Sequence, residues 1–169
     1  NVTGVTVGTY SGTGIQTSGN ISLSTAGDLN INANVRTTGN NSTVTLIANN
    51  NGVVGDLTIA GTAAADVRAV NGDITLEGEN IIIGNNGFTG YAYTSGTGNI
   101  DINADRDAGN DSDVTIGNDG YLNAGGDIKI DGARDVIINN NASNNPIQAS
   151  GSIGIGTDGA NPVTRDVTI

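Results

Sequence analysis

Residues 27–31 read Gly-Asp-Leu-Asn-Ile, and this short stretch decides the fold. Its apolar residues, Leu29 and Ile31, are separated by one polar residue, which is the pattern of a β-strand with one buried face. Similar apolar pairs recur about every 23 residues along the chain. A short unit that repeats at such a period is typical of a solenoid, in which each repeat packs on its two neighbours.

The apolar pairs divide into three series, and each series predicts one side of the solenoid. The first series comprises Val5 and Val7, Leu29 and Ile31, Val53 and Val54, Ile74 and Leu76, Ile100 and Ile102, Leu122, Ile147, and Val167 and Ile169. The second comprises Ile21 and Leu23, Val44 and Leu46, Val67, Tyr91 and Tyr93, Val114 and Ile116, and Val136 and Ile138. The third comprises Val35, Leu57 and Ile59, Ile81 and Ile83, Ile128 and Ile130, and Ile153 and Ile155.

The three series predict an all-β fold, a three-sided parallel β-helix of about seven coils that forms a single domain over residues 1–169. We expect equivalent apolar residues of successive coils to stack inward, with Ile21, Val44, Val67, Tyr91 and Val114 in one column. The segments 84–98 and 103–112 are irregular, and we expect them to bulge from the shaft as loops.

A glycine followed by Asp or Asn precedes many of the predicted strands. These pairs begin at Gly27, Gly55, Gly72, Gly98 and Gly126. The glycine suits the corner between two sides, and the Asx side chain can accept a hydrogen bond from a backbone N–H group at the bend.

Composition narrows the classes of partner and chemistry. The formal net charge of −11 argues against nucleic acid and anionic membranes, which are bound by clustered Lys and Arg. The chain has no Cys and no His, so it offers neither a disulfide nor a cysteine or Ser-His nucleophile. No apolar run approaches the roughly 18 residues that span a bilayer, and no signal peptide is recognisable.

The two ends of the chain fall in the same series and show no capping helix. Val5 and Val7 at one end, and Val167 and Ile169 at the other, are therefore predicted assembly edges. Two interpretations remain open: the chain is a piece of a longer solenoid, or copies of it stack head to tail into a filament.

The Gly-Asp strand motifs carry a family resemblance. Residues 27–31, 55–59, 72–76 and 126–130 each read Gly-Asp, then two apolar residues around a polar one. They resemble the repeats of filamentous haemagglutinin-type exoproteins, the large secreted adhesins of bacterial two-partner secretion. The resemblance implies a right-handed parallel β-helix, an extracellular or cell-surface location, and a role as shaft or adhesive surface.

The densest acidic segment, residues 101–113, is a candidate calcium site. Hard cations such as Ca²⁺ take six to eight oxygen ligands, which Asp and Asn around a Gly can supply. The candidate ligands are Asp105, Asp107, Asn110, Asp111 and Asp113. The spacing does not match an EF-hand loop, and the alternative is a solvated loop without metal. We expect no other cofactor.

Two further groups of residues have competing interpretations. Glu77 and Glu79 could serve a polysaccharide-cleaving enzyme, but they alternate with Leu76, which places them on the outer face or a corner. Tyr91 and Tyr93, near Phe88, could stack on sugars if they face outward; we favour the interpretation that they face the core.

The sequence therefore predicts a non-enzymatic extracellular structural protein. It would act as the shaft of a surface adhesin or as a filament subunit, with itself or the rest of a longer solenoid as partner. The alternative function is a glycan-binding surface module, and the remote alternative is a polysaccharide-cleaving enzyme.

Overall fold

All regular structure in the described part of the chain is β-strand. The computed structural model describes residues 4–8, 14–48, 54–62, 64–85, 87–104, 112–139, 145–156 and 167–168. Nineteen strands and no helix lie in these ranges. Accordingly, the described ranges contain no helix long and apolar enough to cross a membrane.

The strands form three parallel sheets. Sheet 1 has seven strands, β1 (Gly4–Val7), β4 (Asp28–Ile31), β7 (Leu57–Ile59), β10 (Ile81–Ile83), β13 (Asp113–Ile116), β16 (Asp135–Ile138) and β19 (Val167–Thr168). Sheet 2 has six strands, β2 (Ile15–Thr17), β5 (Val35–Asn40), β8 (Ala65–Val70), β11 (Gly90–Ser95), β14 (Gly120–Ala124) and β17 (Ile147–Ala149). Sheet 3 also has six, β3 (Ile21–Ser24), β6 (Val44–Ile47), β9 (Ile74–Glu77), β12 (Ile100–Asn103), β15 (Ile128–Asp131) and β18 (Ile153–Ile155).

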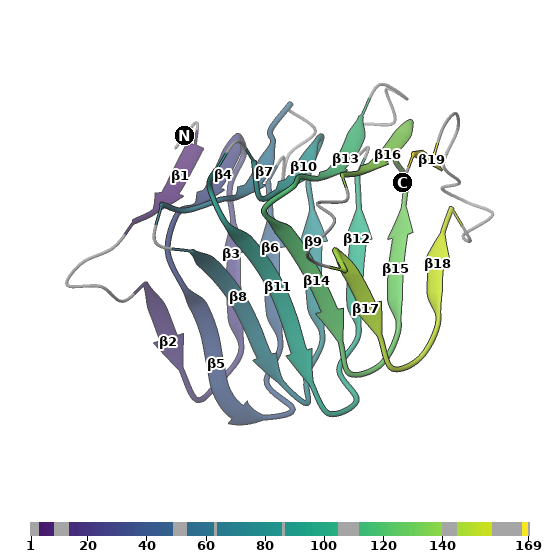
Figure 1. Cartoon of the computed structure of the whole chain (residues 1–169). Coiled ribbons are helices and arrows are strands. Elements are labelled where there is room, and N and C mark those ends of the chain that lie inside the picture. Colours follow the sequence, from purple (N-terminus) through teal and green to yellow (C-terminus); the bar gives the residue numbers. More distant parts are fainter. Residues whose placement is uncertain are drawn as a thin grey trace.

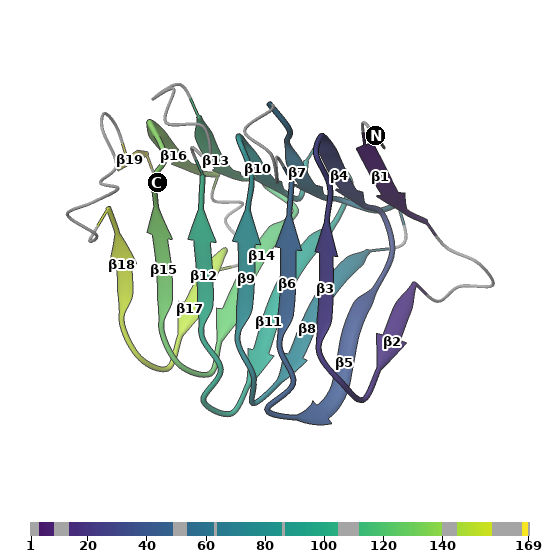
Figure 2. The same cartoon turned by 180° about the vertical axis from the view of Figure 1, so that it is seen from behind.

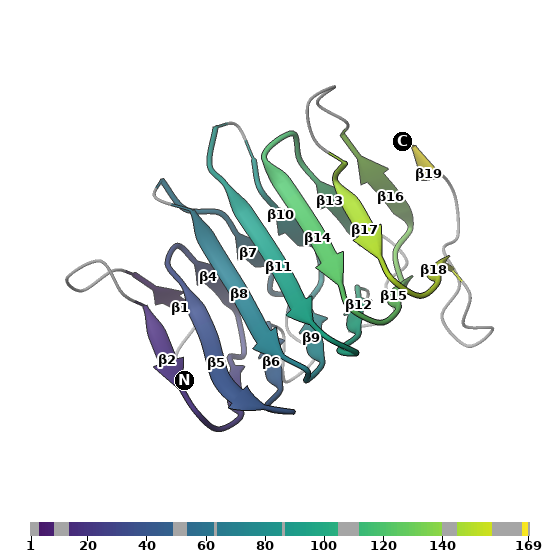
Figure 3. The same ribbon diagram turned by 60° about the horizontal axis from the view of Figure 1, so that its bottom comes forward.

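The chain visits the three sheets in rotation, so each coil contributes one strand to each side. In Figure 1 the strands of sheet 2 run down the near side while the coils advance from left to right. Figure 2, from behind, shows the strands of sheet 3 running up, and sheet 1 closes the top in both views. This path is a right-handed three-sided β-helix, as predicted, and the tilted view of Figure 3 shows its staggered stack of coils.

The coils are less regular than the sequence period suggests. Within sheet 1, the step from Val114 to Val136 is 22 residues, and the step from Ile81 to Val114 is 33. Seven strands in this sheet make six steps between β1 and β19. The steps depart from the predicted period of about 23 residues in some coils, because corner segments of different lengths separate the strands.

This irregularity also makes the predicted columns wrong. Ile21 and Val44 do stack, and they belong to sheet 3, but their next partner is Ile74. The proposed third member, Val67, lies in sheet 2, and Val114 lies in sheet 1. Because the three sides carry similar aliphatic pairs, a few extra corner residues shifted each predicted series from one side to the next.

Not every apolar pair is a strand, and not every irregular segment is a loop. Val54 lies before β7 with 65% of its surface exposed, and Val53 lies outside the described residues. Conversely, residues 90–95 within the predicted loop 84–98 form the six-residue strand β11. Most of the second predicted loop, residues 105–111, lies outside the described ranges.

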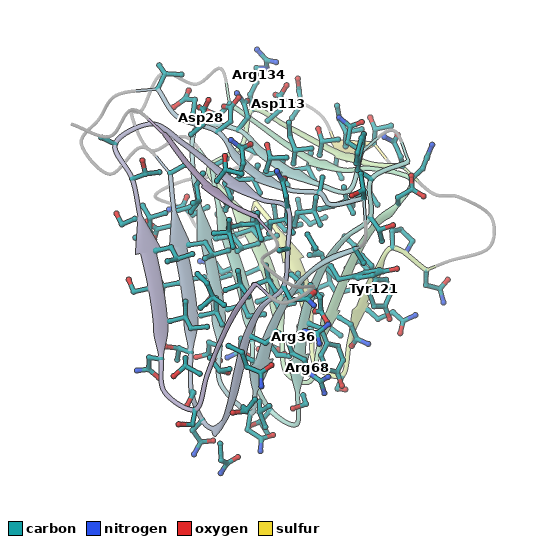
Figure 4. All side chains as sticks on the ribbon, turned by 90° about the vertical axis from the view of Figure 1, so that its left-hand side faces the viewer. Asp28, Arg36, Arg68, Asp113, Tyr121 and Arg134 are labelled. Atoms are coloured by element: carbon teal, nitrogen blue, oxygen red, sulfur yellow. The ribbon has the colours of Figure 1, made fainter. Side chains whose placement is uncertain are left out.

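The core is an aliphatic column enclosed by the three sheets. In β10, Ile81 and Ile83 are fully buried and Ile82 lies on the outer side, and the same alternation runs through β4, β9 and β12. In the axial view of Figure 4 the inward side chains fill the triangular section. Burial of this apolar surface stabilises the stack.

The Asx residues at two corners form ladders from coil to coil. At the corner before sheet 3, Asp73 Oδ1 accepts the N–H of Asn99 at 2.8 Å, and Asn99 Oδ1 accepts the N–H of Asp127 at 2.8 Å. Asp127 Oδ1 in turn accepts the N–H of Ser152 at 2.7 Å. The corner before sheet 1 repeats the arrangement, with Asp28 Oδ1 accepting the N–H of Asp56. The prediction that these side chains satisfy backbone N–H groups at the bends is confirmed.

Candidate ligand-binding face

The tyrosines of β11 point away from the core. Along β11 the buried residues are Gly90, Ala92 and Thr94, while Tyr91 and Tyr93 are partly exposed on the outer side. The interpretation of these tyrosines as core residues is therefore wrong. Gly90 explains the direction, because a Cβ at this inward position would lie 2.0 Å from the carbonyl oxygen of Ile59. Only glycine fits there, so the residue that follows it faces outward.

Neighbouring strands continue the pattern on the outer side of sheet 2. Tyr91 lies beside Tyr121 in the strand register, and Tyr93 lies between Arg68 and Asn123. We call this surface the tyrosine face, and it consists of Arg36, Asp66, Arg68, Tyr91, Tyr93, Tyr121 and Asn123. Figure 4 shows the labelled members Arg36, Arg68 and Tyr121 on one side of the prism, away from Asp28, Asp113 and Arg134.

The rings and the charged groups hold one another in place. The rings of Tyr91 and Tyr121 meet edge to face, with centroids 6.0 Å apart. The guanidinium of Arg68 lies over the ring of Tyr93 at 4.9 Å, a cation–π contact. Asn123 Nδ2 donates to the hydroxyl oxygen of Tyr121 at 3.0 Å. A surface ordered in this way loses little side-chain entropy when it binds a ligand.

A salt bridge borders the rings on the N-terminal side. Arg36 Nη2 lies 2.6 Å from Asp66 Oδ2, with the two side chains 37% and 19% exposed. Such a half-exposed pair adds little stability. Its main effect on the tyrosine face is to neutralise the charge of Arg36.

Two hollows open on the tyrosine face and share Tyr91 and Tyr121. One is lined by Asp66, Arg68, Tyr91, Tyr93 and Tyr121. The other is lined by Thr89, Tyr91, Asp119, Gly120, Tyr121, Asn145 and Gln148. Rings therefore stand between hydroxyl, amide, carboxylate and guanidinium groups, which is a suitable arrangement for a polar ligand that also has an apolar side.

Sheet 3 has a different outer surface. Its hollow is lined by Thr75, Glu77, Asp101, Ile102, Asn103, Lys129 and Asp131, and we call this surface the acidic face. Lys129 Nζ lies 2.7 Å from Asp131 Oδ2. Although Asp101 keeps an exposed surface, partial desolvation raises its pKa, the carboxylates of Asp73, Asp131 and Asp127 raise it further, and Lys129 opposes the shift.

The two glutamates occupy different surroundings. Glu77 lines the hollow of the acidic face, whereas Glu79 is buried at the corner between β9 and β10. Ser112 Oγ donates to Glu79 Oε1 at 2.8 Å, which ties that corner to the next coil. A glycosidase needs two carboxyl groups at one groove, and these two do not line a common hollow.

The candidate calcium ligands lie mostly outside the described residues. Four of them lie outside the described ranges, namely Asp105, Asp107, Asn110 and Asp111. The calcium site therefore stays a prediction. Asp113 is described, in β13, where its Oδ2 lies 3.0 Å from Nη2 of Arg134. The described ranges contain no group of three or more acidic side chains placed to hold a metal.

Among the predicted assembly edges, Val5 and Val7 lie in β1 and Val167 lies in β19, and both strands belong to sheet 1. β1 pairs with β4, and β19 pairs with β16, at opposite edges of the sheet. Val7 is buried and Val167 is 47% exposed. Ile169 lies outside the described residues, as does the side chain of Val5. Pairing of these edges with another copy stays a prediction.

Sequence reasoning missed most of the tyrosine face. Arg36, Asp66, Arg68, Tyr121 and Asn123 were not singled out, although a signal existed. Gly-Tyr occurs twice in the chain, at Gly90 and at Gly120, and the two dipeptides are in register on adjacent strands. Comparison of the chain with protein-family models, with curated proteins and with solved structures finds no match.

Proposed function

We propose that the chain is a non-enzymatic module of an extracellular surface protein, in which a β-helical rod carries a glycan-binding face. The observation that supports this most is the tyrosine face, where three tyrosines and two arginines stand outward on adjacent strands, and where the tyrosines and Arg68 line two hollows. The core is complete without them, since Val67, Ala92 and Leu122 of the same strands are fully buried. These large outer side chains are therefore available for binding.

The chemistry of the face suits carbohydrate. A pyranose ring has an apolar C–H side that packs on the electron-rich face of an aromatic ring, and hydroxyl groups around its rim that need hydrogen-bonding partners. The face offers tyrosine rings, with Asn123, Gln148 and Asp119 beside them. A nucleic acid also stacks on aromatic rings, but a net charge of −11 opposes a polyanion.

The extracellular setting is supported by the Gly-Asp strand motifs. They resemble the repeats of filamentous haemagglutinin-type exoproteins, for which a role at the cell surface is expected. A chain without cysteine is compatible with that setting and needs no disulfide, since the coil stack supplies the core.

A glycan array tests the proposal, with the wild type compared to Tyr91→Ala and Tyr121→Ala. We expect binding to at least one class of glycan, and each variant should weaken it about tenfold or more, the usual effect of removing an interface aromatic. Phe88→Ala is the matched control, because Phe88 is 44% exposed but lines a different hollow, with Asn32 and Asn85. Wild-type protein that binds no glycan, or binding that both tyrosine variants retain, would overturn the proposal.

A purely structural role, as the shaft of an adhesin or as a filament subunit, is the second candidate. It is supported by the continuous core, which runs through the coils from Val7 to Ile138. Electron microscopy of the native material distinguishes single rods from fibres of indefinite length. A purely structural role also predicts that Tyr91→Ala and Tyr121→Ala give the same glycan-array signal as the wild type.

A further inference from the structure

We propose that the ligand of the tyrosine face is an acidic glycan, one that carries a carboxylated pyranose, and that Arg68 binds the carboxylate. This inference rests on the proposed glycan-binding function and adds the chemical class of the ligand. Arg68 lines the hollow that contains the three tyrosines, so a carboxylate held there belongs to the same sugar chain that packs on the rings.

Arg68 differs from the other cations of the described part of the chain. Arg36 pairs with Asp66, Lys129 with Asp131, and Arg134 with both Asp113 and Asp135. Among these same described residues, no carboxylate lies within ion-pair distance of Arg68, whose contact is with the ring of Tyr93. Its Nε atom is buried and has no hydrogen-bond partner there. Arg68 therefore has an unused capacity to bind an anion.

The geometry favours a planar anion such as a carboxylate. A guanidinium presents its N–H groups in a rigid fork that fits the two oxygens of one carboxylate. The ring of Tyr93 covers one face of this guanidinium, which excludes water from that side and keeps the fork oriented. Tyr91 and Tyr121 line the same hollow as Arg68, so a sugar whose carboxylate binds to this guanidinium lies beside their rings.

The overall charge limits how acidic the ligand can be. The chain has a net charge of −11, and three of its carboxylates, those of Glu77, Asp101 and Asp131, lie on the acidic face on another side of the prism. Because salt screens exposed charges beyond about 8 Å at physiological ionic strength, those carboxylates act weakly on the tyrosine face. With the charge of Arg36 neutralised, one free guanidinium suits a glycan with isolated carboxylates, and a densely sulfated polymer would be repelled.

Isothermal titration calorimetry tests the inference with matched oligosaccharides. The probes are a hyaluronan hexasaccharide, in which every second sugar carries a carboxylate, and its carboxyl-reduced neutral form, with a heparin hexasaccharide as the sulfated probe. We expect the hyaluronan hexasaccharide to bind about tenfold or more tightly than its neutral form, and more tightly than the heparin hexasaccharide. Arg68→Gln should abolish that preference, so that the acidic form and the neutral form bind to this variant with affinities equal within about twofold.

Arg134→Gln is the matched control, since it removes an arginine from a distant corner of the prism, as Figure 4 shows, and should leave the preference intact. Thermal unfolding followed by circular dichroism verifies that both variants are folded. Equal affinity for acidic and neutral forms, a preference that survives Arg68→Gln, or tighter binding of heparin would each overturn the inference but leave glycan binding standing. If no probe binds and the glycan array is also negative, the inference about an acidic ligand and the proposed glycan-binding function both fail.

Discussion

The tyrosine face and the acidic face are built on the same backbone plan, yet they expose opposite chemistry. Both cover parallel strands of the same coils, joined at the corner between β11 and β12. On the inner side both carry buried aliphatic residues, such as Leu122 in β14 and Ile100 in β12. On the outer side one presents tyrosines and Arg68, and the other presents Glu77, Asp101 and Asp131.

The difference shows how a β-helix separates stability from surface chemistry. Alternation along each strand assigns every second residue to the core, and packing restricts those positions to residues that fill the prism. The other positions contribute little to the core, so they are free to differ between faces. Their composition is therefore the best guide to what the molecule binds.

The largest expected effect tests whether the two sheets share the same inner construction. Leu122→Ala, under the tyrosine face, and Ile100→Ala, under the acidic face, should each lower the free energy of unfolding by about 2–5 kcal/mol, since both side chains are fully buried. Tyr121, the outward neighbour of Leu122, provides the matched control: Tyr121→Ala should lower the free energy of unfolding by less than about 1 kcal/mol. Urea unfolding followed by circular dichroism measures all three. A cost for Tyr121→Ala as large as that for Leu122→Ala would mean that the ring belongs to the core.

The next effect concerns the corner that leads into the tyrosine face. At Gly120 an added Cβ would lie 2.0 Å from the carbonyl oxygen of Ile83, so the backbone would have to move. We expect Gly120→Ala to lower the free energy of unfolding by about 1–3 kcal/mol.

Gly19→Ala is the control for that substitution, because the nearest atom to its added Cβ, Oγ1 of Thr17, lies 3.9 Å away. Its effect on thermal unfolding should stay below about 0.5 kcal/mol. A Gly120→Ala protein as stable as the Gly19→Ala protein would contradict the close contact between the two coils.

A smaller effect is expected at the corner where the two faces meet. Asn99→Ala removes the oxygen that accepts the N–H of Asp127, and the loss of one such bond should cost about 1 kcal/mol. Hydrogen exchange at the Asp127 amide should accelerate. Asn118→Ala, which changes an exposed asparagine in the turn before β14, should leave that amide unchanged. Unaltered exchange in Asn99→Ala would show that the ladder does not protect the corner.

The smallest effect depends on pH and concerns the acidic face. Partial desolvation and the carboxylates of Asp73, Asp131 and Asp127 raise the pKa of Asp101 above its usual 3.8. The folded protein therefore holds this proton to a higher pH than the unfolded chain does, so the contribution of Asp101 to stability falls as pH rises from 3.8 through the folded pKa. Asp101→Asn removes that decline.

We therefore expect the stability of Asp101→Asn, relative to the wild type, to increase from pH 3 to pH 7, as measured by thermal unfolding in matched buffers. Thr45→Ala, which alters an outward residue of β6, should show no such trend with pH. A stability difference between Asp101→Asn and wild type that is constant with pH would contradict the raised pKa.

Local pattern was sufficient to predict the architecture. Alternation at pairs such as Leu29 and Ile31 depends on strand geometry alone, and the Gly-Asx corners depend on backbone angles and on hydrogen bonds close to the bend. These signals require no knowledge of distant contacts. The sequence was therefore sufficient to predict the parallel three-sided fold and the absence of helix from the described residues. It also predicted that Asp73 and Asp127 accept backbone N–H groups at the corners.

The register of the coils could not be predicted in this way. An apolar pair does not identify the side of the prism to which it belongs, and the corners vary enough for a coil to step by 22 residues at Val114 or by 33 at Ile81. Register is selected by simultaneous packing of all three sides and by the Asx ladders between coils. Only the folded stack shows which pairs are neighbours.

The sequence by itself therefore determined the kind of fold, the alternation of each strand and the chemistry of the corners, because these follow from the nearest residues along the chain. Only the tertiary structure decided that Tyr91 faces outward, since the reason is the close approach of Gly90 to the carbonyl oxygen of Ile59 in the preceding coil. The same stacking brought Arg68, Tyr93 and Tyr121 onto one surface. A binding face made from successive coils depends on register, and register is a property of the whole stack.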